Sequence, residues 1–190
     1  MTRARLVSAV LAILLVTVAA VADRLSAPDR DSELVRAPLE QATAYGSGEV
    51  RVSDVRVATE VREGEDSFRT QGLYVVVNVA VRATGRDQVS AASSRLLAEG
   101  GVTYLPAFGL GSSVKAVPGF ETARDLVFEV DPARIDGLTL ELWHQGLVYR
   151  YYQRTQTPLG ITTGNARAWV EAGTGRSVVA VRDDLTTGLP

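Results

Sequence analysis

The sequence predicts an all-β domain, an antiparallel β-sandwich, preceded by one N-terminal hydrophobic helix. Two observations predict the sandwich. About eight or nine short segments alternate between apolar and polar residues at roughly 8–12-residue spacing, and Gly, Pro or charged turns separate them. One observation predicts the helix, since residues 6–22 are apolar and carry no charge. A closed β-barrel is the alternative architecture for the same pattern of strands.

The composition is that of a globular chain with one domain and an appendage. Of the 190 residues, 46% are hydrophobic and 22% are charged, which suits a sizeable buried core. All acidic residues follow Ala22, so this part of the chain is mildly acidic and lacks the clustered Lys and Arg that a nucleic-acid partner requires. The chain has no cysteine, which excludes disulfides, thiolate metal sites, a cysteine nucleophile and a lipid-bearing cysteine.

The N-terminal segment has two interpretations. Arg3 and Arg5 precede residues 6–22, which as a helix would reach roughly 26 Å, slightly less than a hydrocarbon core of about 30 Å. As an uncleaved signal anchor, residues 1–22 would hold the chain in the cytoplasmic membrane as an N-in single-pass protein with an extracytoplasmic C-terminal domain. As a signal peptide, the segment would be cleaved between Ala22 and Asp23, after a small-x-small motif, and the protein would be secreted.

Three regions are expected after the N-terminal segment. Residues 23–48 are mixed in charge and interrupted by proline and a Gly-Ser-Gly, and they predict a tether. Residues 49–157 predict the sandwich. Residues 158–190 predict a C-terminal hairpin that turns at 173–175, and a loose tail, both packed on the sandwich.

Within the sandwich, the first strand, residues 50–61, changes phase between Val52 and Val55, which predicts a β-bulge near Ser53 and Asp54. The remaining elements are a polar turn at 62–67, a strand at 72–85, a hairpin at 95–106 that turns at Gly100-Gly101, a loop at 108–117, a turn at Pro118-Gly119, and strands at 120–130, 138–143 and 147–155. The residues expected in the core by their phase are Leu73, Val75, Val77, Val79, Val81, Leu126, Phe128, Val130, Leu138, Leu140 and Leu142. The opposite face of the 72–85 strand is partly polar.

Three quoted stretches carry a resemblance to a known family. "GLYVVVNVAVRATGRD", "LLAEGGVTYLP" and "VPGFETARDLVFEVDPARIDGLTLEL" together resemble the DUF4352 family of bacterial envelope proteins over about residues 49–152. The resemblance implies an immunoglobulin-like β-sandwich behind a signal peptide, lipobox or membrane anchor, and it implies no catalytic residues. The chain departs from the family pattern at Ala83-Thr84, in having no lipobox cysteine, and in its C-terminal hairpin.

Few residues indicate a catalytic, metal-binding or phosphate-binding site. His144 is the only histidine, so it fits a turn residue better than a metal site or a catalytic triad. The acidic stretch with Glu60, Glu63, Glu65 and Asp66 either binds Ca²⁺ or is a solvated hairpin tip, and its spacing matches no calcium loop. The glycine-rich residues 109–113 lack the Lys-Ser pair of a phosphate-binding loop.

The candidate interaction surface is the stretch "YRYYQR". In a strand, Arg150, Tyr152 and Arg154 share one face, and Arg and Tyr are typical of binding interfaces. The alternative is an ordinary strand with Tyr in the core and Arg reaching outward. Trp169 could join this surface.

The expected function is therefore that of a non-enzymatic, extracytoplasmic binding or interaction module of the cell envelope. It needs no cofactor, and its partners are the membrane, through the N-terminal helix, and an envelope protein or polymer. One alternative is an accessory subunit of a membrane complex, for example in transport or secretion. In that case small residues of the N-terminal helix would pack on another membrane helix; they are Ser8, Ala9, Ala12, Ala19 and Ala20. The other alternative is an envelope hydrolase.

Overall fold

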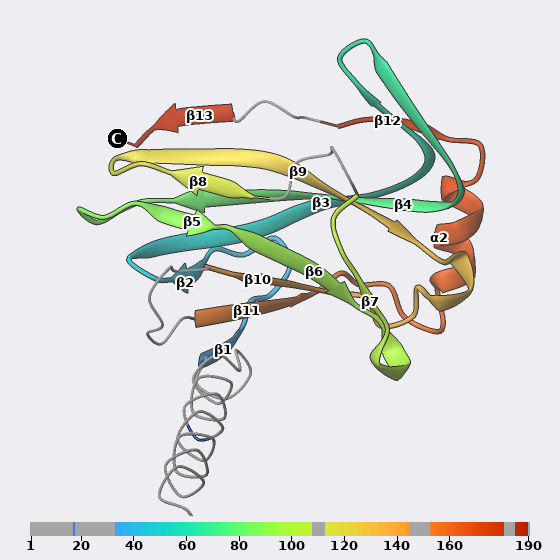
Figure 1. Ribbon diagram of the computed structural model, residues 1–190, viewed down its shortest axis with the longest axis horizontal. Coiled ribbons are helices and arrows are strands. Elements are labelled where there is room, and N and C mark those ends of the chain that lie inside the picture. The colour runs from blue at the N-terminus through green and yellow to red at the C-terminus, as the bar shows by residue number, and fades with distance from the viewer. Residues whose placement is uncertain (1–16, 18–32, 108–112, 145–152, 181–184, 190) are drawn as a thin grey trace, which may run out of the picture. The chain divides into compact units, whose positions relative to one another are not determined.

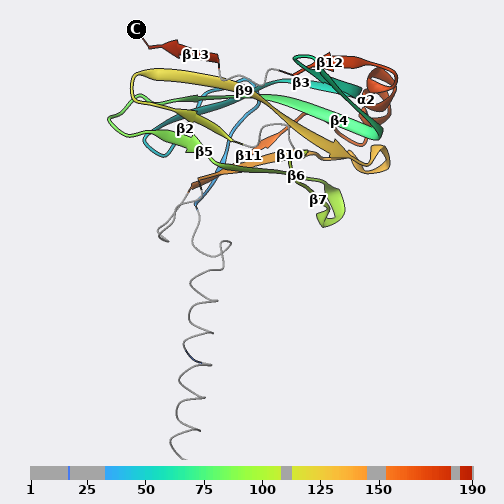
Figure 2. The same ribbon diagram turned by 45° about the horizontal axis from the view of Figure 1, so that its top comes forward.

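The computed structural model describes residue 17 and residues 33–107, 113–144, 153–180 and 185–189. These residues are mostly β-strands arranged in two facing sheets, so the sandwich prediction is confirmed (Figures 1 and 2). One sheet has the order β1-β11-β10-β6-β7, and the other has the order β12-β3-β4-β9-β13 with β2 beside β3. We call them the first and the second sheet. A further short pair joins β5 and β8.

The first sheet consists of β1 (Glu33–Arg36), β11 (Gln153–Pro158), β10 (Thr139–Trp143), β6 (Ser93–Leu97) and β7 (Thr103–Tyr104). The second sheet consists of β12 (Ser177–Val179), β3 (Gly48–Glu63), β4 (Asp66–Arg82), β9 (Phe120–Val130), β13 (Leu185–Gly188) and β2 (Thr43–Tyr45). The other elements are β5 (Val89–Ala91), β8 (Val114–Ala116), the helix α2 (Ala166–Gly173), and short 3-10 turns at Glu99–Gly101 and Pro132–Arg134.

The longest strands pair as the sequence predicts. β3 and β4 form an antiparallel hairpin that turns after Glu63, within the predicted polar turn. The register shifts between Ser53 and Arg56, which confirms the β-bulge, and Asp54 there has a φ of 48°. A left-handed backbone at a non-glycine residue is uncommon, and the extra residue of a bulge is one place where it occurs. A second shift, between Ala58 and Glu60, was not predicted.

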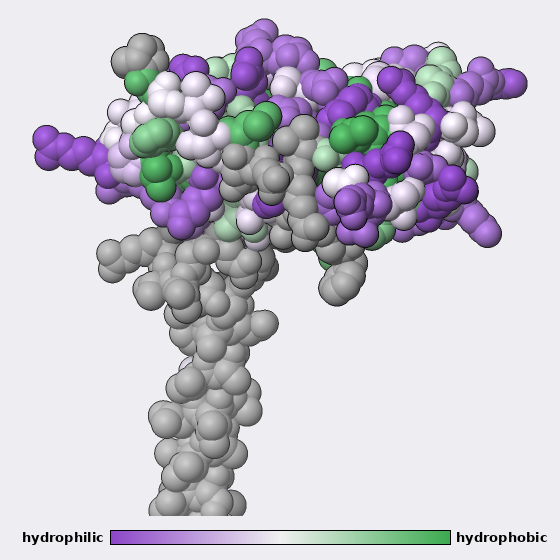
Figure 3. Space-filling view, turned by 90° about the horizontal axis from the view of Figure 1, so that it is seen from above, coloured by the Kyte–Doolittle hydropathy of each residue, from purple (hydrophilic) through white to green (hydrophobic). Residues whose placement is uncertain are grey.

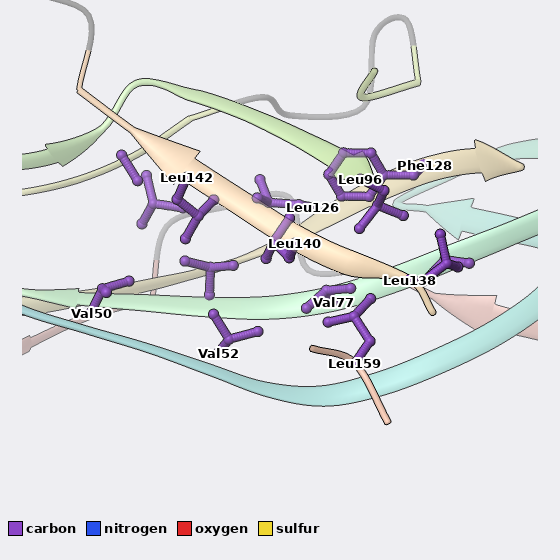
Figure 4. Packing of buried hydrophobic residues seen from close by; sticks show 14 of the residues in the cluster. Val50, Val52, Val77, Leu96, Leu126, Phe128, Leu138, Leu140, Leu142 and Leu159 are labelled. Carbon is purple, nitrogen blue, oxygen red and sulfur yellow. The ribbon is translucent and has the colours of Figure 1, made fainter. Parts of the chain in front are cut away.

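The main core lies between the two sheets. Figure 4 shows side chains of both sheets meeting in this core, with Leu140 of β10 beside Leu126 of β9 and Leu96 of β6 beside Phe128 of β9. All the core residues expected from the strand phase are buried, each with 2% or less of its surface exposed. A side chain of this size contributes roughly 1.5–3 kcal/mol when fully buried, so this cluster is the chief source of stability.

The outer face of the second sheet carries a smaller apolar cluster that was expected to be more polar. Tyr74, Val76 and Val127 of that face pack with Val178 and Ala180. β12 extends the sheet beside β3 and places Val178 next to Val61, so the C-terminal segment adds apolar side chains to this cluster. The alternation of β4 was therefore predicted correctly, but sequence alone did not show that residues of a later segment join the cluster on its second face.

Two strand pairs correct the prediction of a purely antiparallel sandwich. β1 pairs with β11 in parallel, and β12 pairs with β3 in parallel. β1 and β2 lie in the region predicted as a tether, residues 23–48, and Ala37 and Tyr45 there are buried. The sandwich therefore begins at Glu33, before the predicted boundary at residue 49, because these short segments are stabilised by pairing with distant strands.

The C-terminal region also differs from the prediction. The expected hairpin turning at 173–175 is instead the helix α2 followed by β12. Ala166, Trp169 and Val170 are spaced as one apolar helix face and pack on the main core. The expected loop at 108–117 contains β8, and the expected loose tail contains β13, which pairs with β9. Apart from Thr17, the N-terminal segment 1–22 lies outside the described residues, and within the described part no helix has the length and apolarity to cross a membrane.

Candidate functional site

The outward face of the first sheet gathers charged and aromatic side chains from four strands. Neighbouring strands place register partners side by side on the same face, since side chains alternate along a strand. One row across the sheet contains Arg36, Gln156, Glu141 and Arg95, and the next contains Leu34, Arg154, Trp143 and Ser93. We call Leu34, Arg36, Arg95, Glu141, Trp143, Arg154 and Gln156 the arginine face.

Glu141 is the centre of the arginine face. Its side chain is only 1% exposed although it points away from the main core. Its carboxylate accepts hydrogen bonds from Arg154 Nη1 at 2.9 Å, from Arg95 at 3.2–3.3 Å, and from Gln156 Nε2 at 3.4 Å. A buried carboxylate is stable as an ion only where donors and opposite charges surround it, and two guanidinium groups provide both here.

Trp143 and Leu34 add apolar surface beside this cluster. The guanidinium carbon of Arg95 lies 5.4 Å from the centre of the Trp143 ring, within the range of a cation–π contact. Leu34, on the edge strand β1, is 48% exposed. Trp143 is half-buried, and His144 after it is exposed. The arginine face therefore combines fixed positive groups with accessible apolar surface.

Three of the four charges on the arginine face are positive. Arg36, Arg95 and Arg154 share this face with one acid, Glu141, on a chain with a net charge of −2. The outer face of the second sheet differs, because it carries arginine–acid pairs: Arg51–Glu121, Arg82–Glu121, Arg82–Glu49, Arg56–Asp54 and Arg56–Asp125. These pairs contain three arginines and four acids. Among the described residues, the arginine face therefore has more arginines than acids.

The predicted interaction residues are only partly described. Arg154 lies on the arginine face, with its side chain 15% exposed and paired with Glu141. Arg150 and Tyr152 lie outside the described residues, in the connection between β10 and β11. Sequence reasoning did not identify Arg95 and Glu141 as members of the site. The outward phase of Glu141 between Leu140 and Leu142 was the one sequence signal that could have identified it. Its pairing with Arg95 depends on the register between two strands, which the sequence does not show.

The acidic hairpin tip is explained by local bonds. Glu60 accepts hydrogen bonds from Ser67 and from Arg69, and these lower the pKa of its carboxyl group below the usual range. Glu65 and Asp66 are exposed, whereas Glu63 is buried. No group of three or more His, Cys, Asp or Glu side chains in the described part of the chain could hold a metal ion. The calcium-binding alternative therefore gains no support from this hairpin.

A second polar cluster on the outer face of the second sheet has a structural role. Asp125 is fully covered and accepts hydrogen bonds from Asn78 at 3.0 Å and from Arg56 at 2.6 Å. Arg56 also donates to the backbone oxygen of Val179 at 3.0 Å, so it attaches β12 to the sheet. A shallow groove of about 120 Å³ lies further along this face, and the paired side chains of Arg51, Arg82 and Glu121 line it. Both features are satisfied by internal pairs.

Large exposed hydrophobic areas are not seen on the face in Figure 3. That face is mostly hydrophilic, and its hydrophobic residues form small, separate patches. Across the described residues, the exposed large hydrophobic side chains are Leu34, Leu105, Val117, Phe120, Val179 and Leu185. Only Leu34 belongs to the arginine face.

Comparison with known proteins shows no family for this chain. No family model matches the chain, and no curated protein matches it. The crystal structure of the yjhA protein from Bacillus subtilis aligns with 80% of this chain and 98% of its own, at 13% identity and a TM-score of 0.41. An uncharacterized β-sandwich protein from Clostridium difficile aligns with 67% of this chain and 97% of its own, at 7% identity and a TM-score of 0.43.

Proposed function

We propose that this protein is a non-enzymatic binding module of the bacterial cell envelope, and that its arginine face binds an anionic partner. The observation that carries the proposal is the cluster of Arg95, Glu141 and Arg154, with Trp143 and Leu34 beside it. Arg and Trp are enriched at the centres of binding interfaces, where they contribute more binding energy than most other residues.

The cluster has the properties of a prepared binding surface. The bonds to Glu141 hold the guanidinium groups of Arg95 and Arg154 in place, so less conformational freedom is lost when a partner binds. Arg36 lies in the same row and is exposed. Guanidinium groups favour a carboxylate-, sulfate- or phosphate-bearing partner.

The described residues also support a non-enzymatic role. Glu141 is held by two arginines, so it is a poor general base or nucleophile. His144 is exposed at the end of β10, and a catalytic histidine normally needs a partner that orients it.

The proposal also includes where the protein is located and which family it resembles. The apolar residues 6–22 support an extracytoplasmic domain that is attached to the membrane or secreted. The resemblance to DUF4352 supports an immunoglobulin-like topology for the sandwich. An accessory subunit of a membrane complex would use the same arginine face toward a protein partner.

Site-specific photo-crosslinking tests the proposal. A photoreactive amino acid placed at Leu34 should give a discrete adduct in intact cells, and Arg36→Gln should weaken it. The matched control is the same amino acid at Val179, which is 64% exposed on the second sheet. Equal adduct patterns from both positions, or none from position 34, would overturn the assignment of the binding face.

A further inference from the structure

We propose that β13 is a self-association site, and that two copies of this chain pair along it and join their second sheets. The inference concerns a different sheet from the arginine face, and it does not depend on the binding role proposed for that face. In the joint sheet, the β13 strands of the two copies lie side by side and antiparallel, related by a two-fold axis.

β13 is an edge strand with one open side. It ends the second sheet, and β9 is its pairing partner among the described strands (Figures 1 and 2). Just after the strand, the backbone N–H of Leu189 donates to the carbonyl of Gly119, on the β9 side. Backbone groups alternate in direction along a strand, so those of Thr186 and Gly188 point away from β9. A further strand would pair with these groups.

β13 lacks the charged residues and prolines that usually protect an edge strand from pairing. Its residues are Leu-Thr-Thr-Gly, and all four are exposed. The edge strand β1 of the first sheet differs, because it carries Glu33 and Arg36. β12, at the other edge of the second sheet, is also uncharged, but the carbonyl of Val179 there already accepts a hydrogen bond from Arg56. β13 is therefore the edge best suited to pairing.

The sequence of β13 suits pairing with itself. A two-fold axis at Thr187 would use every outward backbone group of Thr186 and Gly188, which gives about four hydrogen bonds between the copies. Thr187 would lie opposite its own copy, and Leu185 would lie opposite Leu189 of the second copy. Threonine pairs and apolar pairs stabilise neighbouring strands, whereas like charges in opposite positions destabilise them. The strand is therefore complementary to a second copy of itself.

Exposed apolar side chains lie at the same edge. Leu185 is 59% exposed, and Phe120, the register partner of Gly188, is 40% exposed. Val117 is 47% exposed in the turn before β9, where its carbonyl accepts a hydrogen bond from the N–H of Phe120. These are three of the six large hydrophobic side chains that are exposed in the described part of the chain. A second copy along β13 would shield apolar surface here, and this shielding favours association.

The experiment uses single cysteines, because the natural chain has none and any disulfide must then join two copies. Opposite residues of a non-hydrogen-bonded antiparallel pair have Cα atoms about 4.5 Å apart, which is within the range of a disulfide. Thr187→Cys should therefore give a covalent dimer of the full chain in detergent under mild oxidation. Leu185→Cys should not, because the two copies of this position would lie about 13 Å apart along the strands. Val179→Cys, at a position 64% exposed on β12, is the control for random collision.

Sedimentation equilibrium in detergent of matched density tests the same contact without a crosslink. The natural chain should show a monomer–dimer equilibrium. Gly188→Pro removes an outward N–H from each copy, so it should weaken dimerisation by at least about tenfold. Gly188→Ala is the matched control, because it keeps the N–H and its Cβ would lie 3.9 Å from Phe120 Cε1, an ordinary contact. If Gly188→Pro does not fold, Leu185→Lys compared with Val179→Lys provides the same test.

A covalent dimer from Thr187→Cys alone, with weaker association of Gly188→Pro than of Gly188→Ala, is the result that the inference predicts. Equal crosslinking of the three cysteine variants, or none in any of them, with the fold intact by circular dichroism, overturns it. A natural chain that stays monomeric at every concentration overturns it as well. Equal dimerisation of Gly188→Pro and Gly188→Ala, both folded, excludes β13 as the contact.

Discussion

Replacement of Glu141 by glutamine is the sharpest test of how the arginine face is built. The substitution keeps the size of the side chain but removes the charge that holds Arg95 and Arg154. The glutamine retains one acceptor oxygen, while its NH₂ group points toward guanidinium donors. Both arginines then lose their counter-charge in a region where Glu141 is 1% exposed.

The expected loss follows from the contacts. Hydrogen bonds to charged groups contribute about 1.5–3 kcal/mol each, and breaking a buried ion pair costs about 3–5 kcal/mol. Arg95 is 29% and Arg154 15% exposed, so water partly compensates them. We expect Glu141→Gln to lower the free energy of unfolding by ~2–4 kcal/mol, by analogy with such pairs. With a urea m-value of about 2 kcal/mol/M, the midpoint should fall by about 1–2 M.

Urea unfolding of the full chain in a mild detergent, followed by tryptophan fluorescence, measures this loss. The matched control is Glu121→Gln, which also removes an acid that binds two arginines, Arg51 and Arg82, but at a more exposed site. It should cost less than about 1 kcal/mol, as exposed pairs do. The reasoning is refuted if Glu141→Gln costs no more than Glu121→Gln.

Three further predictions concern the rest of the fold. Gly173→Ala should destabilise the fold by about 1–3 kcal/mol, because a Cβ there would meet Leu73 Cδ1 at 2.6 Å. The control Gly164→Ala should be tolerated, because its Cβ would meet only Thr162 Oγ1, at 3.8 Å. Thermal unfolding of the two variants compares their stability. Burial raises the pKa of Tyr45, so its contribution to stability is present below the usual pKa of 10.0 and is lost as the pH rises above it. Tyr45→Phe should therefore flatten the decline in urea midpoint between neutral pH and about pH 11, and an unchanged slope would contradict this cause. Arg56→Gln removes the bond to Val179 and a donor to the covered Asp125, so hydrogen exchange should quicken at 177–180 by at least about tenfold more than in β10; an equal increase in both would exclude this local role.

The strands and core residues could be predicted because side-chain alternation is a local property of the chain. Leu138, Leu140 and Leu142 alternate in five residues, and burial follows directly from that phase. The strands of the tether region could not be predicted, because β1 depends on pairing with β11, more than a hundred residues later. Local propensity in so short a segment is weak compared with this tertiary contact.

The helix α2 and most of the arginine face were not predicted, and the reasons differ. Gly173-Thr174-Gly175 suggested a hairpin turn, although the spacing of Ala166, Trp169 and Val170 already indicated a helix face. The arginine face was only partly predictable. The outward phase of Glu141 is local, but its position opposite Arg95 depends on the register between β10 and β6, which no local pattern determines.

Hydroxyl-radical footprinting of the protein in native membranes tests the central claim most directly, namely that the arginine face is the face in contact with its partner. Leu34, at 48% exposure, and Trp143 report on this face, and Val179 and Leu185, at 64% and 59%, report on the second sheet. The account predicts that oxidation of Leu34 and Trp143 is lower in membranes than in detergent, while oxidation of Val179 and Leu185 is unchanged. Protection of Val179 and Leu185 with full reactivity at Leu34 and Trp143 would contradict it.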